Sequence, residues 1–124
     1  MKDNRPVNLD LFTIKQPLPA IASILHRISG IILLFGIGVL IYFWDQSLSS
    51  PQGFAEVQEL FANPLIKLVV WGIVSALLYH FVAGFKHLLM DFGIGETLEG
   101  VNIAAKLVLG ISIALIIFAG VCIW

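Results

Sequence analysis

Charged residues are distributed so unevenly along this chain that three long stretches contain none. The stretches span residues 28–44, 68–85 and 107–124. A helix needs about 20 apolar residues to cross a bilayer, whereas a spanning strand needs only about 10 residues of alternating polarity, a pattern that is missing here. We therefore expect an all-α membrane protein with three transmembrane helices.

The connections between the stretches carry helix start signals. Asn63 and Pro64 suit the N-cap and first positions of the second helix. Residues 50–61 begin with Ser-Pro and then repeat apolar residues at helical spacing, which suits a short interfacial helix and an ordinary polar loop equally well. The predicted organisation is a cytoplasmic N-terminal segment (1–19), a first span (20–45), a periplasmic loop with the short helix (46–63), a second span (64–91), a cytoplasmic loop (92–102) and a third span (103–124).

Composition narrows the class of protein and its partners. Of the 124 residues, 59% are hydrophobic and 12% are charged, against about 25% charged in soluble domains. A net charge of −1 without a basic cluster argues against nucleic acid as a partner. The single cysteine, Cys122, excludes an internal disulfide and a Cys-based metal cluster. We therefore expect a lipid environment around this chain.

The basic residues predict an orientation, because Lys and Arg are enriched on the cytoplasmic side of membrane proteins. The loop between the first two spans offers only Lys67, so the N-terminus is expected in the cytoplasm and the C-terminus in the periplasm. The N-terminal segment resembles neither a cleaved signal peptide nor an acid-free transit sequence, which favours a bacterial inner membrane. The residues on the predicted cytoplasmic side are Lys2, Arg5, Lys15, Arg27, Lys86 and Lys106.

One fixed charge, Arg27, falls inside an apolar segment, where charge is costly and points to function. Arg27 lies one helical turn after Ser23, with His26 beside it. A side chain near the start of a span can also reach the lipid headgroups, and this interpretation stays open. A hydroxyl and a cation one turn apart can donate hydrogen bonds to a quinone and stabilise the negative charge of its reduction. Ser23 and Arg27 are therefore candidate quinone-binding residues.

All three histidines are expected in the cytoplasmic half of the spans. His80 lies in the second span, and His87 follows seven residues later on the same face, about 10 Å further along. Because neighbouring spans are antiparallel, His26 is expected at a similar depth. A lone intramembrane histidine is more often a packing residue than a metal ligand. The neighbours of His80 nevertheless make it a candidate haem ligand.

Small residues surround His80 at four-residue spacing. Gly72, Ala76 and Gly84 share its helical face, a pattern that commonly serves close helix packing. A flat wall beside an imidazole also suits a planar macrocycle, so Ala76 and Gly84 are the expected haem-facing residues. Because only one suitable axial ligand is present, a haem would be shared with another chain. Buried propionates need charge-assisted partners, for which the candidates are His26, Arg27 and His87.

Two stretches are similar to signatures of a known family. Residues 5–30 read RPVNLDLFTIKQPLPAIASILHRISG and residues 80–93 read HFVAGFKHLLMDFG. Both resemble the cytochrome b subunit of succinate dehydrogenase, in the same order along the chain. The resemblance implies a hydrophobic anchor that holds a flavoprotein and an iron–sulfur protein at the cytoplasmic face and pairs with a second hydrophobic anchor subunit. The whole complex would pass electrons from succinate to ubiquinone, linking the tricarboxylic acid cycle to the respiratory chain, with no succinate chemistry in this chain.

The resemblance also implies roles for individual residues. His80 would be one axial ligand of haem b, and the second anchor would supply the other. Ser23 and Arg27 would line the ubiquinone pocket, while His26 and Arg27 would lie by the haem propionates. The family usually has Arg where this chain has Lys86, and Lys cannot make the bidentate contact of Arg.

Two other functions fit the same residues. An anchor of a fumarate reductase would serve the reverse reaction of the succinate/fumarate couple. Nothing in the motifs sets the direction of this reaction. A non-redox membrane protein, such as a small transporter subunit or an assembly factor, would use the histidines and Arg27 for a proton path or for packing. An optical spectrum of the purified complex separates the redox and non-redox interpretations.

Overall fold

The computed structural model describes Asp10 and residues 14–124, which contain four α-helices. Three are long: α1 (Leu18–Ser49), α3 (Pro64–Asp91) and α4 (Leu98–Ile123), while α2 (Pro51–Phe61) is short. Each long helix is long and apolar enough to cross a membrane, which confirms the predicted all-α class with three spans. Residues 1–9 and 11–13, and with them Lys2, Arg5 and the early part of the first signature, lie outside the described residues. The orientation of the termini stays a prediction.

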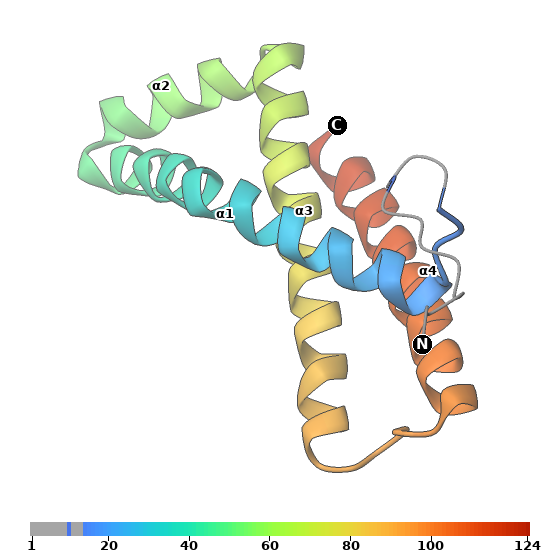
Figure 1. Cartoon of the computed structure of the whole chain (residues 1–124). Helices are drawn as coiled ribbons and strands as arrows, with labels where there is room; N and C mark the ends of the chain where they lie inside the picture. The colour runs from blue at the N-terminus through green and yellow to red at the C-terminus, as the bar shows by residue number, and fades with distance from the viewer. Residues whose placement is uncertain (1–9, 11–13) are drawn as a thin grey trace, which may run out of the picture.

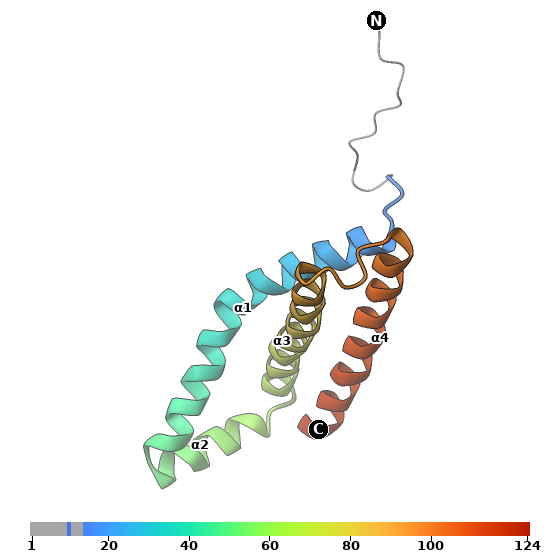
Figure 2. The same cartoon turned by 90° about the horizontal axis from the view of Figure 1, so that it is seen from below.

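Helix α3 lies between the other two long helices. It packs most extensively against α4 and is crossed obliquely by α1 (Figure 1). The end of α3 and the start of α4 lie together at one end of the molecule, and α2 joins α1 to α3 at the other, while the first turns of α1 lie beside the second half of α3 (Figure 1 and Figure 2). Successive long helices therefore run in alternating directions. This arrangement brings residues near the start of α1 to the second half of α3.

Small side chains dominate the surfaces through which the helices meet. Within lipid, helices associate by close van der Waals contact rather than by the hydrophobic effect, so small residues are favoured there. At Gly36, an added Cβ would lie 2.8 Å from Cγ2 of Ile73, so the missing side chain sets how closely α1 approaches α3. The buried residues are Ala22, Ser29, Leu33 and Gly36 of α1, Val70, Ile73, Ala76, Tyr79 and Ala83 of α3, and Ala105, Val108 and Ser112 of α4.

Most apolar side chains point outward. In the most apolar 18-residue window of α1, α3 and α4, only 17%, 22% and 11% of the residues are buried within the described structure. A soluble protein hides its large apolar side chains from water. These outward faces therefore need lipid or another membrane subunit around them.

Capping groups, rather than apolar composition, set where α3 and α4 begin. Thr97 Oγ1 accepts a hydrogen bond from the backbone N–H of Gly100 at 3.0 Å, so α4 starts upstream of residue 103. Asn63 caps α3 in the same way, with Pro64 in the first turn. The helices thus extend beyond the uncharged stretches, on both sides in α1 and α3 and on the N-terminal side in α4.

The segment between the first two long helices is helical, which decides between the helix and the loop that its sequence allowed. Helix α2 folds back onto the end of α1, where the rings of Phe43 and Phe61 pack edge to face with centroids 5.3 Å apart. Gly53 is buried against the carbonyl oxygen of Gln46, which leaves no space for a Cβ. The location of α2 at the membrane interface stays a prediction.

Candidate functional site

The three histidines come from two helices and form one cluster. The ring of His26 in α1 stacks on the ring of His80 in α3, with centroids 4.1 Å apart and planes inclined by 12°. His87, two turns further along α3, is tilted by 60° against His26, with centroids 5.1 Å apart. The structure therefore brings together the three imidazoles that the sequence placed in the same half of the spans.

His80 is held through only one of its two ring nitrogens. Its Nδ1 lies 2.9 Å from Oγ of Ser29 and 3.2 Å from the carbonyl oxygen of His26. Its Nε2, at the opposite edge of the ring, makes no hydrogen bond within the described part of the chain. Histidines that bind metals commonly use one nitrogen for the metal and the other for a hydrogen bond that fixes the ring. The contacts of His80 suit that division.

Gly30 allows α1 to approach the His80 ring closely. A Cβ at this position would lie 3.3 Å from Cε1 of His80, closer than ordinary van der Waals contact. Because His26 stacks against the same ring, His80 has little freedom to move away. The ring is therefore confined by packing as well as by hydrogen bonding.

His26 has a polar atom without a partner. Its Nε2 is buried and makes no hydrogen bond with the described residues. An unsatisfied buried polar group costs about 1–3 kcal/mol. This nitrogen therefore points to a partner outside the described residues, such as a carboxylate of a bound group or a group from a neighbouring subunit.

Ser23 and Arg27 flank the cluster instead of joining it. The face that α1 turns toward α3 includes Ala22, His26 and Ser29, and Ser23 and Arg27 each follow one position later around the helix. Ser23 is half-buried and Arg27 is exposed. Neither side chain makes a hydrogen bond or an ion pair with the residues that the structure describes. Their donors are therefore free to bind a ligand or a neighbouring group.

The small residues near His80 have different environments. Ala76 is buried, and a Cβ on Gly84 would lie 3.9 Å from Nε2 of His26, at ordinary contact distance. Gly72, in contrast, has no atom within 4 Å of the place where a Cβ would be. The row of small residues on α3 is therefore packed where it lies beside His26 and His80, whereas Gly72, one turn before Ala76, faces open space.

The described residues contain no group of three or more His, Cys, Asp or Glu side chains that could hold a metal ion. The imidazoles stack and tilt against one another. A metal held at His80 would consequently take its remaining ligands from a cofactor or from another chain.

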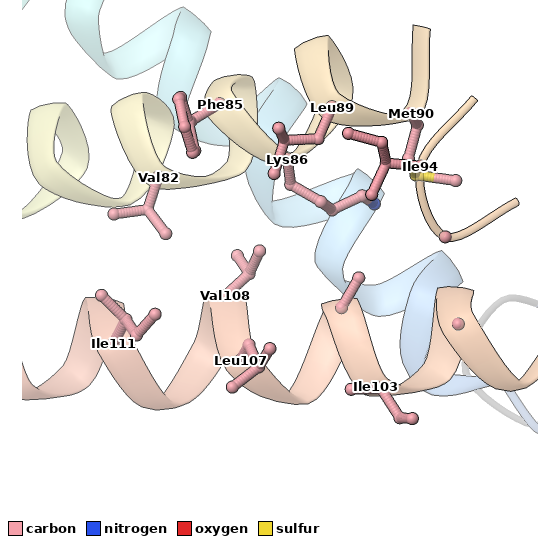
Figure 3. Close-up of a pocket in the computed structure, with 13 residues that line it drawn as sticks. Val82, Phe85, Lys86, Leu89, Met90, Ile94, Ile103, Leu107, Val108 and Ile111 are labelled. Atoms are coloured by element: carbon pink, nitrogen blue, oxygen red, sulfur yellow. The ribbon is translucent and has the colours of Figure 1, made fainter. Parts of the chain in front are cut away.

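A separate groove of about 390 Å³ lies between α3 and α4. Its lining is almost entirely apolar, with side chains such as Val82, Leu107 and Ile111 on facing helices (Figure 3). Lys86 is the charged residue among its described lining residues, and its aliphatic chain extends beside Met90 and Ile94 in the figure.

Two residues of the site were not singled out from their chemistry in the sequence. Ser29 contacts His80, and Tyr79 donates a hydrogen bond to the carbonyl oxygen of Ala22 at 2.6 Å, which ties α3 to α1. The spacing of seven residues between Ala22, Ser29 and Gly36 is the available signal, because it marks a helix face that packs against a partner.

Comparison with known proteins identifies the family of this chain. A family model described as succinate dehydrogenase/fumarate reductase transmembrane subunit matches residues 1–119. The succinate dehydrogenase cytochrome b556 subunit of Coxiella burnetii is 41% identical over 125 residues, covering 100% of both chains. That of Paracoccus denitrificans is 32% identical over 92% of this chain and 88% of its own. The mitochondrial cytochrome b560 subunit of Sus scrofa is 33% identical over 86% of this chain and 64% of its own. The chain is therefore a multi-pass protein of the bacterial inner membrane that belongs to the family of succinate dehydrogenase/fumarate reductase transmembrane subunits, among the cytochrome b556 subunits.

Proposed function

We propose that this membrane anchor binds haem b through His80 and contributes Ser23 and Arg27 to a ubiquinone site of succinate dehydrogenase. The observation that carries the proposal is the state of His80, whose Nδ1 is hydrogen-bonded to α1 while its Nε2 is left for a ligand. The relatives support a haem group because they are named cytochrome b556 subunits.

The residues around His80 fit a haem. The unpartnered Nε2 of His26 would be satisfied by a propionate carboxylate, and Arg27 and His87 would add positive charge or donors nearby. Ala76 and Gly84 present little bulk beside the ligand. When bound, haem b supplies a one-electron carrier. The second axial ligand would come from a second hydrophobic anchor subunit, since the described residues offer one suitably held imidazole.

Ser23 and Arg27 would bind the quinone beside this cluster. Both have donors that no described residue uses, and both lie on the face next to the one that contacts α3. The Ser23 hydroxyl and the Arg27 guanidinium would donate hydrogen bonds to a quinone carbonyl oxygen. The fixed charge of Arg27 would stabilise the negative charge that develops on that oxygen as electrons arrive.

The proposed partners follow from the surfaces of the fold. The outward apolar faces of the long helices would be covered by lipid and by the second anchor. The flavoprotein and iron–sulfur subunits would dock at the end of the molecule where α3 ends and α4 begins, because the part of α1 that carries Ser23, His26 and Arg27 contacts the second half of α3. Succinate would be oxidised in the flavoprotein subunit, so this chain would perform no succinate chemistry.

An optical spectrum of the purified complex tests the haem assignment. We expect His80→Ala to abolish the b-type absorption, while Ser75→Ala, a change on the same helix outside the site, keeps it. A His80→Ala complex with an unchanged b-type spectrum would contradict the assignment.

Paired activity assays test the quinone site. We expect Ser23→Ala and Arg27→Ala to lower quinone reduction by about tenfold or more, as for lost hydrogen bonds to a developing charge. Succinate oxidation with an artificial acceptor should stay unchanged in both variants. Lys106→Ala, which removes another exposed cation, should leave both activities intact. Unchanged quinone reduction in both variants would overturn the quinone assignment, whereas equal loss of both activities would indicate failed assembly.

A further inference from the structure

The Ser29 hydroxyl lies between a backbone carbonyl and the imidazole of His80. Ser29 is only 5% exposed. Its Oγ donates to the carbonyl oxygen of His26 at 2.6 Å and lies 2.9 Å from Nδ1 of His80. Nδ1 also lies 3.2 Å from the same carbonyl oxygen. The three polar atoms therefore form a closed set inside the contact between α1 and α3.

Counting hydrogens in this set decides the tautomer of His80. A carbonyl oxygen can only accept, and a hydroxyl has one hydrogen to donate. The Ser29 hydroxyl donates its hydrogen to the carbonyl oxygen of His26. In the hydrogen bond between Ser29 Oγ and His80 Nδ1, the donor must therefore be an N–H at Nδ1. A bare Nδ1 would instead direct its lone pair at the carbonyl oxygen. All contacts are satisfied when Nδ1 carries the proton and the Nε2 of the neutral ring carries the lone pair.

We propose that Ser29 is a positioning residue that holds His80 in the tautomer able to bind haem iron. The inference rests on the proposed function, in which His80 is an axial ligand. Ser29 fixes the proton on Nδ1 and the ring orientation before the haem arrives. It also makes the imidazole a stronger electron donor, because an acceptor for Nδ1–H raises the basicity of the opposite nitrogen.

Ser75 provides a matched control for removal of a hydroxyl. Its Oγ donates to the carbonyl oxygen of Trp71 on its own helix at 2.6 Å, the same length as the Ser29 bond to His26. The difference is that Ser29 additionally contacts an imidazole. Comparison of Ser29→Ala with Ser75→Ala therefore isolates the contact with His80.

The test uses the assembled complex, depleted of haem and titrated with it, together with the midpoint potential of the loaded haem. We expect Ser29→Ala to weaken haem retention by about 10–100-fold, the usual effect of losing a hydrogen-bond partner of a metal ligand. The potential should become more positive, because a weaker donor stabilises the ferric state less. Ser29→Thr, which keeps the hydroxyl, should restore both values, and Ser75→Ala should change neither.

The outcomes separate this inference from the proposed function. If His80→Ala retains the haem spectrum, the axial assignment itself is wrong. If His80→Ala loses the haem while Ser29→Ala matches Ser75→Ala in retention and potential, the inference alone is wrong.

Discussion

An imidazole within an apolar segment is costly unless its polar atoms are satisfied, and a short stretch of α1 meets this need for His80. Within residues 26–30, the backbone carbonyl and ring of His26, the hydroxyl of Ser29 and the missing side chain of Gly30 all act on the same ring. Each contact restricts a different motion of the ring. The orientation of His80 therefore depends on the local sequence of a helix other than its own.

Gly30→Ala should disturb His80 through shape alone. The new Cβ would lie 3.3 Å from Cε1 of His80, and the stacked ring of His26 limits how far His80 can retreat. We expect haem retention in the purified complex to fall by about tenfold, as for other changes next to a metal ligand. Haem retention is measured as the haem absorbance per complex after extended washing.

Gly38→Ala is the control for that experiment, because a Cβ there has nothing within 4 Å. It adds the same methyl group to the same helix and should leave haem retention unchanged. If the two variants retain haem equally well, the confinement of His80 by Gly30 is wrong.

Tyr79→Phe should loosen the same helix contact without touching an imidazole. The change removes the hydroxyl that donates to the carbonyl oxygen of Ala22 at 2.6 Å. Hydrogen bonds between membrane helices contribute about 0.6 kcal/mol on average and about 1.7 kcal/mol at most. We expect haem absorbance to be lost at a lower temperature when the complex is heated. Tyr42→Phe, at an exposed position of α1, should leave that temperature unchanged.

Much of the site could be anticipated from the sequence, but not its hydrogen bonding. The spacing of His80 and His87 predicted a shared face, and the antiparallel order of the spans predicted that His26 lies near them. The sequence does not say which of the two serines near His26 meets α3. Ser23 and Ser29 are both plausible until the rotation of α1 is known, and the crossing with α3 selects Ser29.

At the scale of the helices, Gly36 sets how closely α1 and α3 approach at their crossing. A Cβ there would lie 2.8 Å from Ile73 Cγ2, so Gly36→Ala forces the two helices apart. Overpacking of this kind costs about 1–3 kcal/mol. We expect a lower temperature of haem loss in the heated complex. The double variant Gly36→Ala with Ile73→Ala removes the clashing atom, and its temperature of haem loss should return part of the way to that of the unmodified complex.

Gly72→Ala serves as the matched control on α3, because it adds a methyl group where no atom lies within 4 Å. An equal effect of Gly36→Ala and Gly72→Ala would contradict the role of Gly36, since the loss would then follow from adding any side chain.

The contact between α3 and α4 is stabilised by a different interaction. Trp71 Nε1 donates a hydrogen bond to the carbonyl oxygen of Ile116 in α4 at 2.9 Å, and Gly120 leaves room for the indole. The spans themselves follow from the gaps between charges, because lipid excludes charge and requires helices. Their crossings depend on where small residues and single donors meet. For this reason the sequence predicts the helices far better than it predicts their contacts.

For the whole molecule, the positions of the basic residues predict how the chain lies in the membrane. An odd number of spans puts the two ends of the chain on opposite sides, with the N-terminus expected in the cytoplasm. A reporter enzyme fused after Trp124 should read as periplasmic, and one inserted between α3 and α4 at residue 95 should read as cytoplasmic. The reverse readings would overturn the predicted cytoplasmic location of the histidine cluster.

The contact between Ser29 and His80 joins residues that are 51 positions apart in the chain. During synthesis, α1 leaves the ribosome well before α3, so His80 meets its hydrogen-bonding partner only after both helices have been threaded into the bilayer. A chain whose first helix fails to insert, or inserts in the wrong direction, cannot present the imidazole correctly. Haem binding at His80 would then occur only in anchors whose helices have inserted in the correct direction, and it would distinguish them from misinserted ones.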